Sequence, residues 1–454
     1  MSQQSDKNSA RKAKQYTRRD ALKWAGLLSG GALVGNVLGC SSSSLPPPTT
    51  TGEVKKDSEP PVKDAVAAAQ APAGKPEKID ITLGFIPLTD CSPLVVGSVK
   101  GFYKKYGLNV TVKKMASWGA TRDAIQKGEI DGAHILLGMI VGFSLGVGDV
   151  ASPTPKVPMN VLQMLNLNGQ CISLSKALLD KGVKTPADVK KEVEAGTKLT
   201  FAMTFPPGTH AMWMCYWLAA GGVHPDKDVK LITIAPPQMV ANMKTGNMDG
   251  FCVGEPWNAR AVDEGIGFTA TTTQGIWKNH PEKVLGVTEK FAMENPNTCK
   301  ALIAGTLDAC RWLDDLKNRP EQCDIVSKSE YVNCKVEQML PRMLGKYIMT
   351  PGGAEVQDPD YMRFFERDTT VPFLSHAMWF MSQYRRWNML AEKPDYLAEA
   401  KKIMRHDLYT EGCKMADVKL PEQMVSRSKE TLFDSVVWDP SDPEAYAQSF
   451  KVKA

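Results

Sequence analysis

Alternating apolar and polar positions predict strands separated by helices from residue 79 onward. Large apolar residues fill every second position in 79–85 and in 108–112, which is the pattern of half-buried strands. A helix is expected between them at 93–106. Apolar spacings of three and four at 361–365 and 378–387 predict two further helices that pack on a core. Strand, helix and strand in this order favour a parallel sheet, so the sequence predicts an α/β protein.

One short turn occurs twice. At 128–132 and again at 246–250 the chain reads Gly, variable residue, apolar residue, Asp, Gly, after a predicted helix and before a predicted strand. Gly can end a helix in the left-handed conformation, and Asp can form a local turn hydrogen bond. The repetition favours two similar α/β lobes over one long sheet. Loops at strand ends in such lobes are the expected place for a ligand.

The N-terminus has the pattern of an export signal. Arg18 and Arg19 precede a short apolar run at 24–38, and Cys40 follows Leu-Gly. Residues 1–39 are therefore predicted to be a lipoprotein signal, twin-arginine-like although Ala21 stands where that signal usually carries Phe, with Cys40 as the lipid attachment site. Export through the Sec route stays open. A membrane-spanning anchor is disfavoured because it needs about 20 predominantly apolar residues.

The segment after Cys40 has the composition of a disordered tether. Residues 41–77 are rich in Ser, Pro, Thr, Ala and Lys. Together with the lipid on Cys40, this linker (residues 40–77) would hold a soluble protein on the periplasmic side of the inner membrane.

Charge and cysteine content exclude several classes of protein. The formal charge is +5, but residues 1–39 contain seven Lys or Arg and two Asp, so the rest of the chain is nearly neutral. Nucleic-acid binding is therefore not expected. Nine cysteines follow Cys40 without a Cys-x-x-Cys pair, and most are expected to be buried without a disulfide framework or a zinc site.

Two loops that follow predicted strands contain candidate ligand groups. His210 comes after the strand at 199–203 and begins a helix-like run, where free backbone N–H groups favour an anion. After the strand at 251–253, Gly254 and Pro256 permit close approach of the backbone to a ligand.

Several motifs together resemble one protein family. They are Gly-Phe-Ile-Pro-Leu-Thr-Asp at 84–90, Ala-Ser-Trp at 116–118, Gly-Glu-Pro-Trp at 254–257, Ile-Trp-Lys-Asn-His-Pro-Glu-Lys at 276–283 and Tyr-Arg-Arg-Trp at 384–387. The set resembles the nitrate-binding lipoproteins of cyanobacterial-type ABC nitrate importers, whose nearest relatives bind bicarbonate. The resemblance implies the two-lobed periplasmic-binding-protein fold, a type II-like C-clamp of mixed, mostly parallel sheets flanked by helices. Lobe I is expected at 78–168 plus 282–454, and lobe II at 169–281.

The resemblance also implies the ligand set. Nitrate would be bound by Trp118, Gln170, His210 and Lys283, with the backbone near Gly254. Indole, amide and imidazole N–H groups can replace the weak hydration shell of nitrate, and Lys283 would supply the compensating positive charge. Considered one at a time, these side chains would be assigned to packing, capping or the surface.

The implied partners are nitrate, or a similar small oxyanion such as nitrite, and an ABC permease with its ATPase. The chain is expected to be a monomer, without enzymatic activity, cofactor or obligatory metal. One alternative is a bicarbonate-binding protein that uses calcium, in whose relatives the position of Lys283 is acidic. Two others are an exported enzyme on the same fold, related to thiamine-precursor synthases, and an anion sensor.

Overall fold

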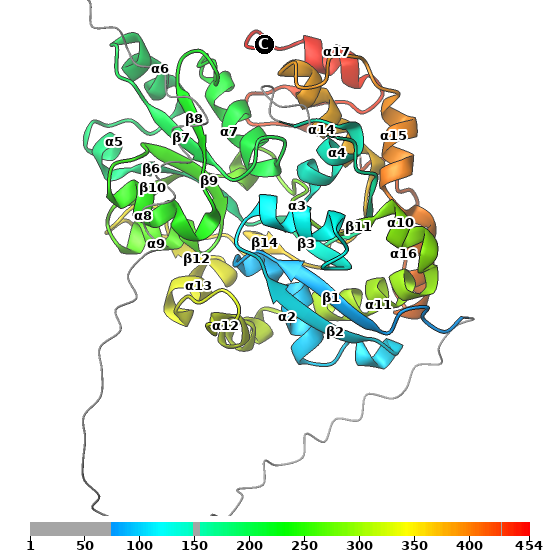
Figure 1. Ribbon diagram of the computed structural model, residues 1–454. Coiled ribbons are helices and arrows are strands. Elements are labelled where there is room, and N and C mark those ends of the chain that lie inside the picture. The colour runs from blue at the N-terminus through cyan, green and yellow to red at the C-terminus, as the bar shows by residue number, and fades with distance from the viewer. Residues whose placement is uncertain (1–73, 149–154, 428) are drawn as a thin grey trace, which may run out of the picture. The chain divides into compact units, whose positions relative to one another are not determined.

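The alternating segments of the sequence form two five-stranded sheets (Figure 1). The structure is a computed structural model that describes residues 74–148, 155–427 and 429–454. The first sheet has the order β2 (Asn109–Lys114), β1 (Asp80–Phe85), β3 (Gly132–Leu136), β11 (Lys283–Thr288), β4 (Met159–Met164). The second has the order β8 (Lys230–Thr233), β7 (Thr200–Met203), β9 (Gly250–Gly254), β6 (Gln170–Ser175), β10 (Gly267–Thr272).

Both sheets have the same pairing pattern. In each, the first three strands and the fifth run in one direction, and only the fourth strand, β11 or β6, runs against them. The sheets are therefore mixed, as expected, but parallel pairs are not the majority. Strands β6 and β11 each enter from the other sheet, through 165–169 and 273–282, and each is antiparallel to both of its neighbours. These crossing segments bring the edges of the two sheets together.

The repeated turn occupies equivalent places in the two sheets. Gly128 and Gly246 have φ of +70° and +74°, so both glycines end their helices in the left-handed region as the sequence predicts. Each turn leads into the third of the five strands of its sheet, β3 or β9. The carboxylates of Asp131 and Asp249 accept backbone N–H groups of β1 and β7 at 2.9 and 2.8 Å. The expected hydrogen bond of Asp is therefore formed with a neighbouring strand and not within the turn.

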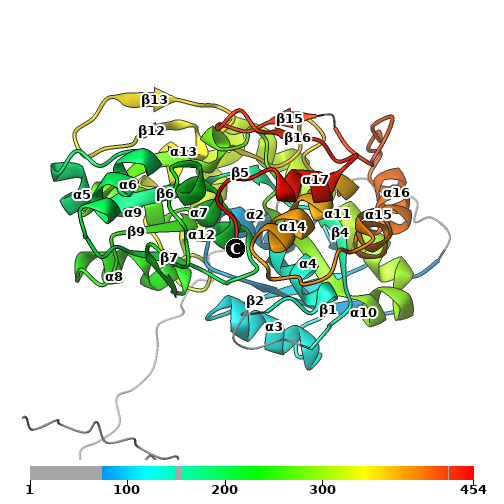
Figure 2. The ribbon, with the colours of Figure 1, turned by 90° about the horizontal axis from the view of Figure 1, so that it is seen from above.

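Helices cover the sheets and are more extensive than strands in the C-terminal third. The helices of the first half are α2 (Ser92–Val99), α3 (Trp118–Gln126), α4 (Leu137–Leu145), α5 (Lys176–Asp180), α6 (Pro186–Glu194), α7 (Thr209–Ala220), α8 (Met239–Lys244) and α9 (Trp257–Asp263). Those of the second half are α10 (Glu289–Glu294), α11 (Pro296–Asp314), α12 (Arg319–Ser327), α13 (Val336–Met343), α14 (Leu374–Arg386), α15 (Tyr396–Ile403), α16 (His406–Met415) and α17 (Pro443–Gln448). In Figure 2, α14 lies beside α15 and α17, and all three pack together, with α14 also on α4.

Two of the expected helices differ from the structure. The helix expected at 93–106 ends at Val99, because Gly101 adopts φ +76°, and a short 3-10 helix at Lys104–Tyr106 follows. The segment expected to be helical at 361–365 instead contains strand β14 (Met362–Arg363), which pairs with β5 (Leu167–Asn168) in the crossing segment. The helix expected at 378–387 is confirmed as α14.

The small strands complete the described chain. They are β12 (Lys346–Ile348), β13 (Glu355–Gln357), β15 (Glu430–Thr431) and β16 (Val437–Trp438). The sequence predicts that most cysteines after Cys40 are buried, and in the structure all nine are buried and free. Within the described ranges, no helix is long and apolar enough to cross a membrane.

The N-terminal predictions fall mostly outside the described residues. The signal at 1–39, Cys40 and the predicted linker up to residue 73 all lie there. Glu77, the last residue of that linker, accepts the backbone N–H groups of Asn297 and Thr298 at 3.1 and 2.9 Å, near the beginning of α11.

Candidate anion site

The candidate site lies where the crossing segments join the two sheets. Asp90 follows β1 in the 3-10 helix Thr89–Cys91, and Lys283 begins β11 opposite the last residue of β3. Gln170 begins β6 opposite Gly254, the last residue of β9. His210 is the second residue of α7, after β7. In both sheets these positions lie at the carboxyl edge of the parallel strands, where α/β proteins bind ligands.

The structure brings the predicted ligand residues together. Gln170 Nε2 and Lys283 Nζ both donate to Asp90 Oδ2, at 3.0 and 2.8 Å, and His210 Nε2 lies 2.7 Å from Gln170 Oε1. A Cβ atom on Gly254 would lie only 2.8 Å from Gln170 Oε1. The Trp118 ring lies 6.0 Å from Lys283 Nζ. All five residues are buried in one cluster.

Lys283, which the resemblance implies as the compensating positive charge for the anion, is already paired with two carboxylates. Its Nζ lies 2.8 Å from Asp90 Oδ2 and 2.8 Å from Glu282 Oε1, and all three side chains have 0% exposure. The reason is that a buried ammonium without a counter-charge is very unfavourable. A ligand anion therefore meets a lysine that is already shared by two carboxylates.

The pKa values of these three groups follow from their mutual contact. Burial by itself would raise the pKa of Asp90 and Glu282, but Lys283 outweighs burial and lowers the pKa of Asp90 well below its usual range and that of Glu282 to about 2. Burial would lower the pKa of Lys283, yet the two carboxylates raise it. All three groups are thus charged at neutral pH, with a sum of −1.

Three histidines surround the charged groups. His134 Nε2 lies 2.7 Å from Asp90 Oδ1, and His280 Nδ1 lies 3.8 Å from Glu282 Oε2. Burial is the largest cause that lowers the pKa of His134, His210 and His280, the last to about 4. These imidazoles are therefore neutral at pH 7, and the cluster retains its charge of −1.

The cluster contains a buried donor without a partner. Trp118 Nε1 is buried and forms no hydrogen bond with any described residue. Thr209 Oγ1, at the first position of α7, is likewise buried without a hydrogen-bond partner among the described residues. A buried N–H group without a partner is rare and calls for an explanation, and an anionic ligand would supply one for Trp118.

An aromatic wall holds Glu282 in place. Trp213 Nε1, on α7, donates to Glu282 Oε2 at 3.2 Å. The ring of Trp213 lies 4.6 Å from that of His280 and 4.9 Å from that of Trp379 on α14. The C-terminal helices thus contribute to the cluster indirectly, by packing behind Trp213.

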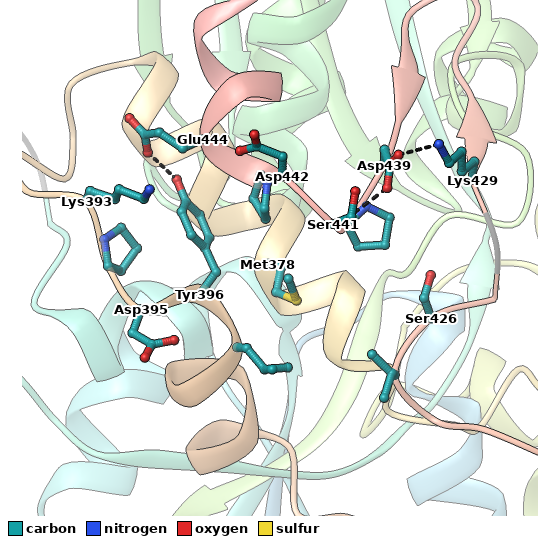
Figure 3. Close-up of a pocket in the computed structure, with 15 residues that line it drawn as sticks. Met378, Lys393, Asp395, Tyr396, Ser426, Lys429, Asp439, Ser441, Asp442 and Glu444 are labelled. Atoms are coloured by element: carbon teal, nitrogen blue, oxygen red, sulfur yellow. Dashed lines mark hydrogen bonds and ion pairs between the residues drawn. The ribbon is translucent and has the colours of Figure 1, made fainter.

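A cavity lies away from this cluster. It has a volume of about 740 Å³ and lies between α14, α15 and the segment that leads to α17 (Figure 3). Its lining contains four carboxylates and two ammonium groups. None of the predicted ligand residues lines this cavity, so it is distinct from the Lys283 cluster. In the described ranges, no group of three or more His, Cys, Asp or Glu side chains is arranged to hold a metal ion.

Four residues of the cluster were not among the ligand residues predicted from the sequence. Asp90 lies in the motif at 84–90, and His280 and Glu282 lie in the motif at 276–283, so their place in the family motifs was the available signal. His134 carried no signal, because one His within an apolar strand is indistinguishable from a core residue. Cys40 lies outside the described residues.

Comparisons with known proteins agree on one family. The model of the NMT1-like family matches residues 74–327. The chain is 40% identical over 455 residues to the nitrate/nitrite binding protein NrtA of Synechococcus elongatus, covering 97% of this chain and 99% of that protein. It is 32% identical over 393 residues to the bicarbonate-binding protein CmpA of the same species, covering 82% and 87%. The crystal structure of the periplasmic nitrate-binding protein NrtA from Synechocystis matches with a TM-score of 0.80 at 39% identity, over 84% of this chain and 100% of that one.

Proposed function

Because the chain belongs to the NMT1-like family, and within it to the nitrate-binding group that contains NrtA, we propose that it captures nitrate outside the cytoplasm and delivers it to an ABC importer. Nitrite is a second candidate cargo, since the relative with 40% identity is described as binding both ions. The protein acts as a binding protein and not as an enzyme.

One observation carries the assignment of the site. Residues that are far apart in the sequence, from Trp118 to Lys283, meet in one buried cluster at the edges of two sheets. The cluster combines an ammonium group, an imidazole and an amide with the unpaired indole N–H of Trp118. A small planar oxyanion accepts hydrogen bonds from all such groups. We therefore assign nitrate binding to Trp118, Gln170, His210, Lys283 and the backbone of Gly254.

Bicarbonate is the alternative cargo, because CmpA is a relative. In a bicarbonate site that uses calcium, the metal supplies the positive charge, and an acidic residue is expected at position 283. Here position 283 is a lysine, and its ammonium group, paired with Asp90 and Glu282, occupies the place where such an acidic metal ligand would be. The lysine therefore favours nitrate.

The N-terminal sequence completes the proposal. Lipid attachment at Cys40 and the segment that follows it would keep a monomeric binding protein at the outer face of the inner membrane, near its permease. A sensor of the same anion would need the same site, and a permease and ATPase encoded beside this chain would favour the importer.

Calorimetry on the full chain carrying Cys40→Ala, so that no lipid is attached, tests the cargo. The titrants are nitrate, nitrite, sulfate, and bicarbonate with and without calcium. Nitrate is expected to bind with Kd in the micromolar range or below, about −8 kcal/mol or better. Tighter binding of bicarbonate with calcium would contradict the assignment.

A further inference from the structure

The charge of the buried cluster presents a problem for anion binding. Asp90, Glu282 and Lys283 sum to −1 while the histidines are neutral, and each of these three side chains is fully buried. A bound monoanion would make the total −2 in a region shielded from water. Buried charge of one sign is unfavourable unless a proton or a counterion accompanies it.

His210 has the hydrogen-bond partners that permit it to change charge. Its Nε2 lies 2.7 Å from Gln170 Oε1 and 3.4 Å from Glu282 Oε1, which both only accept, so Nε2 carries a proton. The amide orientation of Gln170 follows from its donation to the Asp90 carboxylate. Nδ1 lies 2.6 Å from Thr204 Oγ1, a hydroxyl that can either donate or accept. His210 can therefore gain a proton on Nδ1 when that hydroxyl rotates.

The other two histidines are less suited to this change. His134 uses Nε2 on Asp90, and its Nδ1 has no partner among the described residues, so a second proton would be a buried N–H without an acceptor. His280 bonds to Thr273 and to the carbonyl of Pro281, and the structure gives it no hydrogen bond to a proposed nitrate ligand side chain.

The surroundings of His210 contain few other charges. Asp90, Glu282, Lys283 and His280 act on it from the crossing segments and the first sheet. Helix α4 and strand β7 pack on α7 without a titratable side chain, and α6 meets the far end of α7, where Gly221 touches Pro186. Strand β9 contributes Cys252, whose pKa is raised by burial, so it stays a neutral thiol.

We propose that the site takes up one proton, on His210 Nδ1, with each nitrate that it binds. This inference rests on the proposed function. Before binding, burial, Lys283 and the N-terminal end of α7 keep the imidazole neutral. A bound anion favours the cationic imidazole, so binding and protonation strengthen each other. Above neutral pH, affinity should then fall about tenfold per pH unit.

Calorimetry in several buffers measures the proton directly. Nitrate is titrated into the full chain with Cys40→Ala at about pH 7.5, in Tris, triethanolamine and imidazole, none of which is an oxyanion. The dependence of the binding heat on the ionisation heat of the buffer gives the number of protons taken up, and about one per nitrate is expected. Nitrate binding without proton uptake would overturn this inference and leave the proposed function intact, whereas absence of nitrate binding would contradict both.

Variants then locate the proton without removing a proposed ligand. Thr204→Val deletes the hydroxyl that would accept the new Nδ1–H, so proton uptake should fall. Thr204→Ser keeps a hydroxyl at this position, so proton uptake should stay at the level of the parent. His224→Gln changes a histidine outside the cluster and should keep full uptake. In NMR spectra, the ring resonances of His210 should move to the chemical shifts of a protonated imidazole on addition of nitrate. Unchanged uptake in Thr204→Val together with an unchanged His210 signal would refute His210 as the acceptor.

Discussion

Lys283 is held by two carboxylates that are as deeply buried as the lysine itself. Asp90 comes from the loop after β1, and Glu282 is the neighbour of Lys283 in sequence. Such a group of charges contributes little net stability when it is complete, because desolvation opposes the attraction. It becomes very unfavourable when one member is removed, since the remaining charges stay buried.

Lys283→Met is therefore expected to act on stability as well as on binding. Two buried carboxylates would lose their counter-charge, so the free energy of unfolding should fall by about 3–5 kcal/mol. Nitrate binding should be lost. Urea denaturation and calorimetry measure the two effects. In the double variant with Glu282→Gln, part of the stability should return. Equal stability of Lys283→Met and the parent would contradict a buried ion pair between Lys283 and the two carboxylates.

The two tryptophans of the cluster offer a matched pair. Trp118 Nε1 has no partner in the described structure, whereas Trp213 Nε1 donates to Glu282. Trp118→Phe should therefore leave stability nearly unchanged and weaken nitrate binding by about 1.5–3 kcal/mol, the value of a hydrogen bond to a charged group. Trp213→Phe should instead lower the free energy of unfolding by a similar amount. The reverse result, with Trp118→Phe the destabilised variant, would exclude Trp118 as a nitrate donor.

At the scale of elements, the close pairing of β6 and β9 limits which amino acid can occupy position 254. A Cβ on Gly254 would lie 2.8 Å from Gln170 Oε1 and 3.2 Å from Asp90 Oδ2. Gly254→Ala should displace both side chains and weaken nitrate binding at least tenfold, or about 1.4 kcal/mol. In Gly119→Ala the new Cβ would lie 3.8 Å from Ser117 Oγ, an ordinary contact, and binding should not change. Equal affinities of the two variants would contradict a role for the Gly254 backbone.

The elements themselves could mostly be read from the sequence. Period-two patterns locate β1 and β2, and spacings of three and four locate α14, although this helix is buried on nearly every side. The turns at Gly128 and Gly246 could be predicted from local chemistry alone. The direction of β6 and β11 could not, since it depends on how the chain crosses between sheets. Strand β14 was also missed, because its pairing with β5 overrides a helical spacing.

The chemistry of the site was only partly predictable. Trp118, Gln170 and Lys283 follow from the resemblance, since no local pattern separates them from packing or surface residues. The ion pairs of Lys283 could not be read from the sequence, because Asp90 lies 193 positions away. A buried lysine requires a counter-charge, but the sequence does not show that Lys283 is buried.

At the scale of the whole molecule, buried histidines make the protein sensitive to acid. Burial lowers the pKa of His134, His210, His280 and His376 in the folded state, that of His280 to about 4. Between about pH 6.5 and these lowered values the unfolded chain binds more protons than the folded one, so stability falls as pH falls. Below about pH 4 the loss continues, because Asp90 and Glu282 have lowered pKa values in the folded state and are protonated first in the unfolded chain.

Urea denaturation from about pH 8 to pH 4 measures this loss, and nitrate should change its slope. With saturating nitrate, His210 is already protonated in the folded state, so it no longer contributes to acid sensitivity. With nitrate bound, one histidine fewer takes up a proton on unfolding, so the free energy of unfolding changes less steeply with pH, by up to about 1.4 kcal/mol per pH unit. Nitrate should therefore stabilise the protein more at about pH 6 than at about pH 8. Parallel stability curves with and without nitrate would show that no proton accompanies the anion, because binding and protonation must affect each other equally.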